Sequence, residues 1–518
     1  MCRRNLRRSK AADSTDADLS GGALLLRSLI LRRLLLREVL AADEKYVGVL
    51  IPPSVGSVVV NAVLPLCRRI PVNLNYTVSS DVMNSCIRQC GIRHVLTSRR
   101  VMEKFSLDLD AKLVYLEDFS DKVTLLDKIA AAVQAYAVPA SLLDRLLDLH
   151  RIQDDDLLTV IFTSGSTGEP KGVMLTQRNV ASNIESVNYL LQLRTDDVLI
   201  GILPFFHSTG YTCTLWTVLT LDPKGVYHFS PLEARAVGEL CRKHHVSIMV
   251  SAPTFLRNYL RRCQPEDFAS LEVVLTGAEK LPIELCEAFE KKFGIRPAEG
   301  YGTTELSPIA AVNIPKSRAS SPDQLVCKEG TVGRPIPGVQ VKAIDPDGGA
   351  DLGVDQPGLL CFKGPNVMKG YLNRPDLTAQ VIHDGWYNTG DIGLVNSEGC
   401  VQITGRQSRF SKIGGEMVPH IRIEEELQAI VSADADELKA AVTSVPDPRK
   451  GERLVVLHTE LPKTPEAICR ELAAANLPNI WIPSPDSFCR VEAIPVLGTG
   501  KLDLKALKEL ALQKFNAS

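Results

Sequence analysis

The stretch LLTVIFTSGSTGEPKG, residues 157–172, decides how the rest of the chain is interpreted. Its first six residues are an apolar, β-branched run that is typical of a buried strand. The glycines that follow leave main-chain N–H groups able to point at one anion. Lys171 adds a positive charge. Four side chains add hydroxyl donors: Thr163, Ser164, Ser166 and Thr167. We therefore predict that this loop binds a polyphosphate.

The loop differs from the GxxxxGK[ST] loop of P-loop ATPases. Glu169 and Pro170 precede the lysine, and Gly172 follows it where a serine or threonine is required. The alternative interpretation is a flexible turn after a buried strand. The density of donors around Lys171 favours the phosphate loop.

Short β-rich runs alternate with helical patterns on both sides of this loop. The β-rich runs are residues 46–52, 94–98, 112–116, 157–164, 197–205, 247–253 and 271–279. The helical patterns include residues 177–193, 231–245 and 282–294. Such alternation predicts an α/β fold in which mostly parallel sheets are covered by helices.

The texture changes after about residue 325, where Gly and Pro become frequent and strands follow each other directly, at residues 339–345 and 358–364. A new helix over residues 420–431 and a last α/β pattern follow. We predict three parts, which are a basic, leucine-rich extension (1–45), a large domain (46–405) with a β-rich subdomain (about 325–405), and a small, mobile α+β C-terminal domain (406–518).

The composition excludes several classes of protein. A 518-residue chain with 45% hydrophobic and 23% charged residues is not a disordered chain, a fibre or a small disulfide scaffold. The balance of 59 Lys and Arg against 61 Asp and Glu gives no electrostatic footprint for nucleic acid. The 13 cysteines are scattered singly, and Cys86 and Cys90 suit one helix face. We expect reduced thiols and a cytoplasmic protein.

The amino terminus begins with a basic, then polar segment that we expect to be mobile up to Ser20. Residues 24–40 form a leucine-rich helical pattern that contains four arginines, which exclude a transmembrane span, and no signal-peptide cleavage site follows. Two interpretations stay open. The helix packs on the body of the protein with its arginines outward, or it lies on a membrane surface as a basic amphipathic helix, which would make the protein peripheral.

Seven separated motifs make the chain recognisable. They are TSGSTGEPKG (163–172), PFFHSTG (204–210), TGAEKL (276–281), GYGTTELSP (300–308), GWYNTGD (385–391), GRQSRFSKIGGEMV (405–418) and GTGKLDL (498–504). In this order they resemble the motifs of the AMP-forming adenylating enzymes, which include acyl-CoA synthetases and luciferases. Within that family the residues in and around these motifs are similar to those in the synthetase half of bifunctional acyl-[acyl-carrier-protein] synthetase/2-acylglycerophosphoethanolamine acyltransferases.

The resemblance implies an acid–thiol ligase that uses ATP and Mg²⁺. Such an enzyme joins a carboxylic acid, here a medium- or long-chain fatty acid, to AMP and releases pyrophosphate. It then transfers the acyl group to a phosphopantetheine thiol, on either acyl carrier protein or coenzyme A. The alternative is an adenylating subunit that feeds acyl groups to a separate membrane acyltransferase.

The resemblance also assigns a nucleotide site. Glu305 corresponds to the Mg²⁺ carboxylate, Thr304 to an α-phosphate contact, and Tyr301 to the ring that stacks on adenine, between Gly300 and Gly302. Asp391 corresponds to the acceptor for both ribose hydroxyls, and Arg406 assists it. The remaining nucleotide contacts are Gly277, Ala278 and Glu279 at the adenine edge, and Thr163, Ser164, Gly165, Ser166, Thr167, Gly168 and Lys171 in the phosphate loop.

Three further assignments follow from the resemblance. Lys501 is the lysine that reaches the α-phosphate and the carboxylate during adenylation. His207 lies beside the acyl pocket, with a core histidine as the alternative. The aromatic side chains near it, Phe205, Phe206, Tyr211 and Trp216, could line an apolar channel, although such residues more often belong to the core. Arg409 is the hinge about which the C-terminal domain rotates, and it presents Lys412, Gly414 and Gly415 to the pantetheine arm.

Overall fold

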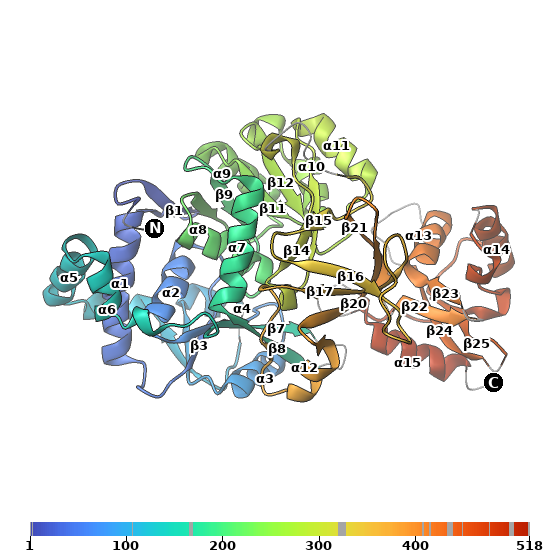
Figure 1. Ribbon diagram of the computed structural model, residues 1–518, viewed down its shortest axis with the longest axis horizontal. Helices are drawn as coiled ribbons and strands as arrows, with labels where there is room; N and C mark the ends of the chain where they lie inside the picture. Colours follow the sequence, from blue (N-terminus) through green and yellow to red (C-terminus); the bar gives the residue numbers. More distant parts are fainter. Residues whose placement is uncertain are drawn as a thin grey trace.

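A nine-stranded sheet forms the centre of the protein (Figure 1). The computed structural model describes residues 2, 4–105, 107–164, 169–319, 328–406, 409–413, 416–431, 439–447, 449–475, 477–496 and 502–515. In spatial order the strands of the central sheet are β15 (Arg334–Pro335), β14 (Ile309–Val312), β13 (Ala298–Gly302), β12 (Val273–Thr276), β11 (Ile248–Ser251), β9 (Val198–Gly201), β10 (Lys224–Tyr227), β1 (Ser9–Asp13) and β2 (Asp18–Ser20). The six strands from β13 to β1 run parallel, and the sheet becomes antiparallel towards both edges.

Helices cover both faces of this sheet. One face buries α9 (Ala234–His244), α10 (Pro253–Arg262) and α11 (Ile283–Phe293), and the other buries α7 (Gln177–Leu191), the π-helix η4 (Gly210–Trp216) and α8 (Thr217–Thr220). Helix α7 begins at a capping box, in which Thr176 and Asn179 satisfy each other's backbone N–H groups. The predicted strand–helix alternation is confirmed here.

A second, fully parallel sheet lies at the amino-terminal end. Its spatial order is β4 (Ile70–Asn73), β3 (Tyr46–Val49), β5 (His94–Thr97) and β6 (Lys112–Tyr115). The helices around it are α1 (Gly21–Glu38), α2 (Val55–Leu66), α3 (Ser80–Cys90) and α4 (Arg99–Phe105). Cys86 and Cys90 are both buried on one face of α3, as predicted.

The strand that opens the phosphate loop belongs to neither parallel sheet. An antiparallel three-stranded sheet contains β18 (Gly370–Tyr371), β8 (Pro170–Thr176) and β7 (Leu157–Ser164). Since Ser164 pairs with Pro170, the loop connects two strands of a hairpin. A P-loop instead leads from a strand into a helix, so the exclusion of that class is supported.

The β-rich part and the C-terminal part each have a sheet of their own. The first holds β16 (Gln340–Ile344), β17 (Gly358–Lys363), β20 (Trp386–Val395), β19 (Ile382–His383) and β21 (Val401–Arg406), with α12 (Pro375–Val381) beside it. The second holds β23 (Glu416–Pro419), β22 (Phe410–Ile413), β25 (Gly451–His458), β24 (Ala440–Asp447) and β26 (Phe488–Arg490), with α13 (His420–Val431), α14 (Pro465–Ala474) and α15 (Leu504–Phe515).

The amino terminus corrects one expectation. Instead of being mobile, the segment before Ser20 supplies β1, which pairs with β10, and β2. Helix α1 packs on α2 and α5 (Leu125–Ala132), and Leu24, Leu29 and Leu35 are fully buried. The interpretation in which this helix packs on the body is therefore confirmed. Within the described ranges, no helix has both the length and the hydrophobicity to cross a bilayer.

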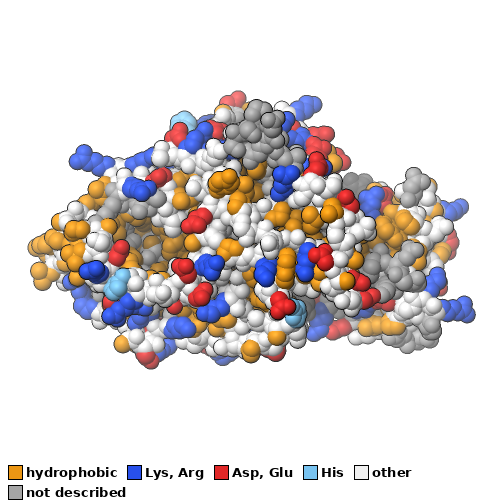
Figure 2. Space-filling model, viewed as in Figure 1, with side chains coloured by type: hydrophobic (Ala, Val, Ile, Leu, Met, Phe, Trp, Pro, Cys, Tyr) orange, Lys and Arg blue, Asp and Glu red, His pale blue; other side chains and the backbone are white. Residues whose placement is uncertain are grey.

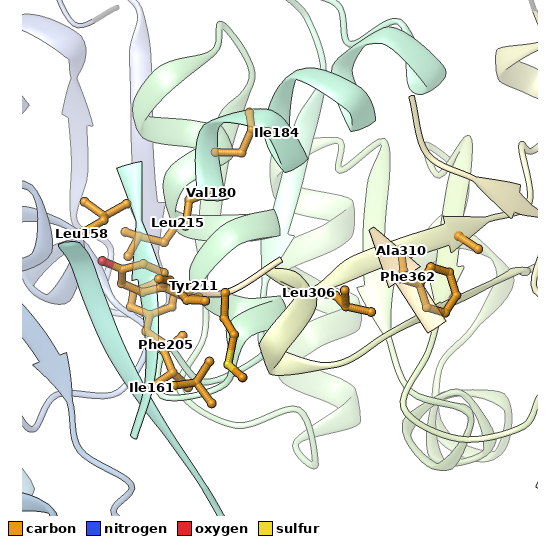
Figure 3. Close-up of a cluster of buried hydrophobic side chains, with 14 of the residues drawn as sticks. Leu158, Ile161, Val180, Ile184, Phe205, Tyr211, Leu215, Leu306, Ala310 and Phe362 are labelled. Atoms are coloured by element: carbon orange, nitrogen blue, oxygen red, sulfur yellow. The ribbon is translucent and has the colours of Figure 1, made fainter. Parts of the chain in front are cut away.

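Two buried clusters, one apolar and one polar, hold the central sheet. Phe205 and Tyr211 point into an apolar cluster beside Leu158 and Ile161 of β7 (Figure 3). These two aromatic side chains are therefore core residues and do not line a channel.

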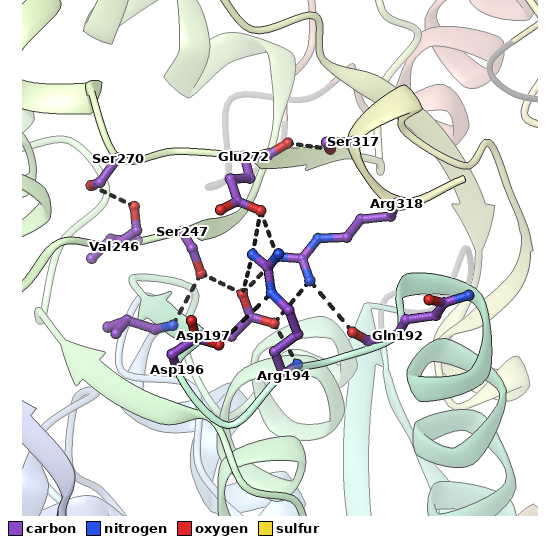
Figure 4. Close-up of polar contacts among 11 residues, drawn as sticks. Gln192, Arg194, Asp196, Asp197, Val246, Ser247, Ser270, Glu272, Ser317 and Arg318 are labelled. Carbon is purple, nitrogen blue, oxygen red and sulfur yellow. Dashed lines mark hydrogen bonds and ion pairs between the residues drawn. The ribbon is translucent and has the colours of Figure 1, made fainter. Parts of the chain in front are cut away.

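A buried polar cluster lies at the amino-terminal ends of β9, β11 and β12. There Arg318 makes a bidentate ion pair with Asp197, with nitrogen–oxygen distances of 2.6 and 3.1 Å (Figure 4). Burial raises the pKa of Asp197, but hydrogen bonds from Arg318, the Arg194 backbone and Ser247 outweigh this and hold it below its usual value.

Candidate active site

A cleft of about 2790 Å³ opens where the parallel strands of the central sheet end, between the large domain and the C-terminal part. Ligands of open α/β sheets bind at this edge. Of the residues predicted from the sequence, the cleft is lined by Thr163, Lys171, His207, Gly277, Ala278, Glu279, Gly300, Tyr301, Gly302, Thr304, Glu305, Asp391 and Arg406. Segments that lie more than 200 residues apart in the sequence thus meet in one cavity.

Asp391 is held from two sides. The Tyr301 hydroxyl donates a hydrogen bond to Oδ2, and Arg406 Nε donates one to Oδ1 at 2.8 Å. Asp391 and Arg406 are cross-strand partners of β20 and β21, so their backbones fix this geometry. Burial and the nearby carboxylate raise the pKa of Tyr301, and Asp391 raises the pKa of Arg406. The phenol therefore stays a donor and the carboxylate an oriented acceptor.

The Tyr301 ring has a defined position at the end of β13. It stacks on Phe362 of β17, with ring centroids 5.7 Å apart and an interplanar angle of 28°. A close backbone contact requires glycine at Gly302, whereas a side chain at Gly300 would fit only tightly. A Cβ at Gly302 would lie 1.8 Å from the Pro308 carbonyl oxygen, and one at Gly300 would lie 3.3 Å from that of Ala311. One ring face is covered by Phe362, and Tyr301 also lines the cleft.

The turn after β12 supplies the segment Gly277–Ala278–Glu279. Ala278 has a φ of +67°, a left-handed conformation that turns the chain sharply at the rim of the cleft. Glu279 is exposed and accepts hydrogen bonds from the backbone N–H and the hydroxyl of Thr254, the latter at 2.7 Å. All three residues of the turn line the cleft.

A second polar group surrounds Glu305, which lies in the 3₁₀ turn η6 (Thr304–Leu306). The Tyr371 hydroxyl donates to Glu305 Oε1 at 2.9 Å, and Lys171 Nζ lies 5.4 Å from the centroid of the same tyrosine ring. Burial, together with Glu305, raises the pKa of Tyr371. Thr304 accepts a hydrogen bond from Ser208 at 3.3 Å. Tyr371 thus links the phosphate-loop lysine to the predicted metal carboxylate.

Glu305 fits a Mg²⁺ ion that shares its coordination with a substrate. Mg²⁺ prefers oxygen ligands and keeps several waters, so one carboxylate plus phosphate oxygens suffices. Across the described ranges, no three His, Cys, Asp or Glu side chains come close enough to form a metal cage. A metal held by Glu305 would therefore share its coordination with groups other than a cluster of such side chains.

His207 is exposed and lines the cleft beside Phe206, with ring centroids 4.6 Å apart. The alternative of a core histidine is therefore wrong. Behind these residues, the cleft extends between the central sheet and α7. This recess is apolar and is lined by Val187, Leu191, Leu199, Ile248, Leu275 and Val312.

Some predicted residues lie elsewhere. Arg409 is buried in the C-terminal part, where it pairs with Glu424 of α13. Lys412 belongs to strand β22. The described residues do not include Gly165, Ser166, Thr167, Gly168, Gly414, Gly415 and Lys501. The side chains of Ser164 and Lys412 also fall outside the description.

The structure adds two cleft residues that the sequence did not single out, Tyr371 and Glu299, and one buried residue that packs on Tyr301, Phe362. Tyr371 and Phe362 contact predicted residues that are 61 to 66 positions away, so no local pattern reveals them. Glu299 precedes the GYG motif, and burial raises its pKa from 4.5 to about 6. Its Oε1 accepts a hydrogen bond from the Leu281 backbone at 3.2 Å. The position of Glu299 directly before the GYG motif in the sequence is the signal that could have identified it.

Comparison with known proteins identifies the family of this chain. A family described as AMP-binding enzyme matches residues 5–372. The 4-coumarate–CoA ligase 3 of Oryza sativa subsp. japonica is 30% identical over 431 residues, which span 81% of this chain and 74% of the rice protein. A long-chain-fatty-acid–CoA ligase of Bacillus subtilis is 32% identical over 379 residues, which span 70% of this chain and 64% of the relative.

The fold also resembles solved structures. The o-succinylbenzoate CoA synthetase of Bacillus subtilis, in complex with an acyl-adenylate intermediate, aligns with a TM-score of 0.78 at 22% identity. The alignment covers 97% of this chain and 95% of that one. At this identity the likeness establishes the fold, with its parallel sheets, β-rich subdomain and C-terminal domain.

Proposed function

This chain belongs to the AMP-binding enzyme family, and we propose that it is an AMP-forming acid–thiol ligase. In the first half-reaction, a carboxylate oxygen attacks the α-phosphate of ATP, which gives an acyl-adenylate and releases pyrophosphate. In the second, a thiol attacks the acyl carbon, which gives a thioester and releases AMP. The proposed acid is a medium- or long-chain fatty acid.

The observation that carries this proposal is the pairing of two polar groups in one cleft. Asp391, held by Tyr301 and Arg406, presents a fixed acceptor that suits the two hydroxyls of a ribose. Glu305 and Lys171, joined through Tyr371, present a carboxylate and a cation that suit a metal-bound phosphate. Such an arrangement favours a nucleotide that lies along the cleft.

Catalysis in this proposal rests on placement and charge. An anionic carboxylate must approach an anionic triphosphate, so the site must neutralise both before bond formation. Lys171 and the phosphate loop would bind the β- and γ-phosphates, and Thr304 would donate to the α-phosphate. A Mg²⁺ ion held by Glu305 supplies charge neutralisation when it is bound. Lys501, brought in by the C-terminal domain, would bind the α-phosphate and carboxylate oxygens.

The apolar recess behind His207 supports an apolar acid. The six described side chains that line it are all aliphatic, and none of them could pair with a second carboxylate. The rice relative is named for an aromatic acid and the Bacillus relative for a long-chain fatty acid. We favour the fatty acid because the recess is lined by aliphatic side chains.

The acceptor is proposed as the thiol of a phosphopantetheine arm. The names of the relatives favour coenzyme A, and acyl carrier protein is the alternative. In this proposal the C-terminal domain rotates about Arg409 after adenylation, and Lys412, Gly414 and Gly415 then border the thiol channel. The cytoplasmic location and peripheral membrane attachment are also part of the proposal.

Thioester formation across a matched panel tests this function. Purified protein with Mg²⁺ and ATP would be given saturated fatty acids from octanoate to octadecanoate, or 4-coumarate, together with coenzyme A or holo-acyl carrier protein. We expect an acyl thioester from at least one fatty acid and a lower kcat/KM for 4-coumarate. A higher kcat/KM for 4-coumarate would contradict the fatty-acid assignment. Adenylate formation without transfer to either thiol would favour a subunit that serves a separate acyltransferase.

A further inference from the structure

Two short helices at one end of the molecule expose an unusual set of apolar side chains. Helix α5 continues into the π-helix η2 (Val133–Ala137), and α6 (Ala140–Leu146) follows directly. Leu125 and Leu126 are 71% and 74% exposed. Five more large hydrophobic side chains on these elements are about half exposed: Ile129, Val133, Tyr136, Leu142 and Leu146.

These side chains form one stripe and are not scattered. At about 100° per residue, Leu125, Leu126, Ile129 and Val133 fall on one side of the helix. Across the described residues, seven of the fourteen exposed large hydrophobics lie between positions 125 and 146. Figure 2 shows orange side chains gathered at the end of the molecule where Figure 1 places α5 and α6. Monomeric proteins rarely expose a contiguous apolar surface without using it.

The opposite sides of the same helices are firmly packed. Ala131 and Ala135 are buried against Leu29 of α1, and Leu143 and Leu147 of the second helix join the same cluster. The helices therefore already have a core-facing side, and the exposed stripe is a second apolar side.

Ion pairs fix the orientation of this lobe. Asp127 caps the first turn of α5 together with Thr124, and it accepts hydrogen bonds from Arg33 and Arg37 of α1 at 2.9 and 3.0 Å. These bonds, with Thr124, hold the pKa of Asp127 well below its usual value. The lobe cannot turn its apolar stripe inward without breaking them.

The charge around the stripe indicates what covers it. Residues 21–38 and 122–151 carry eight Lys and Arg against four Asp and Glu, whereas the whole chain has a net charge of −2. The exposed cations are Arg27, Arg37, Lys122, Lys128, Arg145 and Arg151, of which Arg37 pairs with Asp127 and Arg151 with Asp148, and the exposed acids of the same ranges are Glu38, Asp144 and Asp148. A half-exposed apolar stripe bordered by cations matches the boundary of an anionic bilayer, with acyl chains below and phosphates above.

We propose that the stripe formed by α5, η2 and α6 docks on an anionic lipid bilayer. Leu125, Leu126 and Ile129 enter the headgroup–acyl boundary, and Lys128 and Arg145 contact lipid phosphates. Helix α1 supports this lobe from behind and is itself too deeply buried to lie on the membrane. The inference specifies the surface for the peripheral attachment included in the proposed function, and it does not depend on the proposed reaction, since none of these residues lines the cleft.

Vesicle flotation of the 518-residue chain tests the proposal. The triple variant Leu125→Ser, Leu126→Ser, Ile129→Ser removes the apolar contact, and Tyr189→Ser with Val354→Ser removes two equally exposed hydrophobics elsewhere. With phosphatidylcholine vesicles that contain about one third phosphatidylglycerol, we expect the triple variant to bind at least about tenfold more weakly and the control to bind like the parent. Pure phosphatidylcholine vesicles should bind the parent weakly.

A second pair of variants tests the charges. Lys128→Glu with Arg145→Glu should weaken binding to anionic vesicles and reduce its salt dependence, whereas Lys291→Glu on α11 should not. A tryptophan placed by Leu126→Trp should shift its fluorescence to the blue and be quenched by brominated lipid. Failure of the parent to bind anionic vesicles would overturn the proposal. So would a dimer in sedimentation that the triple variant dissociates, because the stripe would then join two copies of the chain.

Discussion

The two sides of the cleft are built differently. On the large domain, Asp391 and Glu305 are each fixed by tyrosine hydroxyls from other strands, and the cross-strand register of β20 and β21 holds Arg406 in place. On the C-terminal side, Arg409 pairs with Glu424 within its own domain. Across the boundary, Lys280 and Glu425 form an ion pair of 2.9 Å between exposed or partly exposed side chains. The proposed nucleotide contacts are therefore preorganised, whereas the ion pair between Lys280 and Glu425 is exposed enough to be exchanged.

The largest expected difference between the two sides concerns Lys501. In the proposed mechanism, Lys501→Ala removes the cation that the C-terminal domain would bring to the α-phosphate. We expect adenylation to slow by about a hundredfold or more, while thiol transfer from preformed acyl-adenylate is unchanged. Pyrophosphate exchange measures the first step, and single-turnover transfer from synthetic acyl-adenylate measures the second. Lys505→Ala is the matched control on α15. Equal loss of both steps would show that Lys501 does not act in adenylation alone.

Buried titratable groups on the two sides should give opposite pH dependences. Glu299 lies in the cleft wall with its pKa raised by burial from 4.5 to about 6. Between these two pH values the folded state binds more protons than the unfolded state. The free energy of unfolding therefore falls as the pH rises and Glu299 ionises. Since one pKa unit is worth about 1.4 kcal/mol, Glu299→Gln should stabilise the protein by about 2 kcal/mol at pH 7 and lose this advantage below about pH 4.5. Urea unfolding at both pH values measures it.

His420 provides the contrasting case in the C-terminal domain. Burial, with Arg409 and Lys508, lowers its pKa from 6.5 to about 3. The unfolded state then binds more protons in this range, so acidification below about pH 6.5 should destabilise the C-terminal domain. His420→Gln should reduce that sensitivity.

A stabilising effect of Glu299→Gln that is the same at pH 4 and pH 7 would contradict the burial argument.

A smaller effect is expected at the predicted hinge. Arg409→Pro restricts φ and also removes the partner of the buried Glu424, so Arg409→Ala is needed as the control that removes only the ion pair. We expect thioester formation to fall by about tenfold in the proline variant, with adenylation nearly intact. Single-turnover rates for the two half-reactions separate these effects. If alanine and proline behave alike, the loss comes from the ion pair and Arg409 is not a hinge.

The smallest effect should come from the contact between the two sides. Lys280→Ala removes an ion pair whose lysine is 74% exposed, and such pairs contribute less than about 1 kcal/mol. We expect kcat to change by less than about fivefold and the change to disappear at high salt. A steady-state salt titration of the parent and the variant measures it. A large, salt-independent loss would mean that the orientation seen here is locked.

The local part of the fold could be predicted from the sequence because local patterns encode it. The apolar run at 157–164 is strand β7, and the periodic segment at 420–431 is helix α13. Long-range pairing is different. Strand β1 joins β10 more than 200 residues away, and nothing in the polar segment before Ser20 announces it.

Helix α1 shows the same limit. The arginines of residues 24–40 left a surface helix open as one interpretation, but Arg33 and Arg37 hold Asp127, 90 or more residues away, and Leu34 and Leu35 between them are buried. The exposed apolar side belongs to α5 and α6 instead. In the cleft, the motif residues could be named from the resemblance, whereas Tyr371 and Phe362 became visible only once the strands were placed.

Direct detection of an acyl-adenylate tests the central claim. Purified protein would be incubated with Mg²⁺, ATP and fatty acids of eight to eighteen carbons, about the range that an apolar recess of this kind suits, without any thiol. Mass spectrometry should reveal the mixed anhydride of the acid and AMP in the wild type, and Asp391→Ala should reduce it strongly. Absence of the adenylate with every acid, from protein that is folded and binds ATP, would contradict the account.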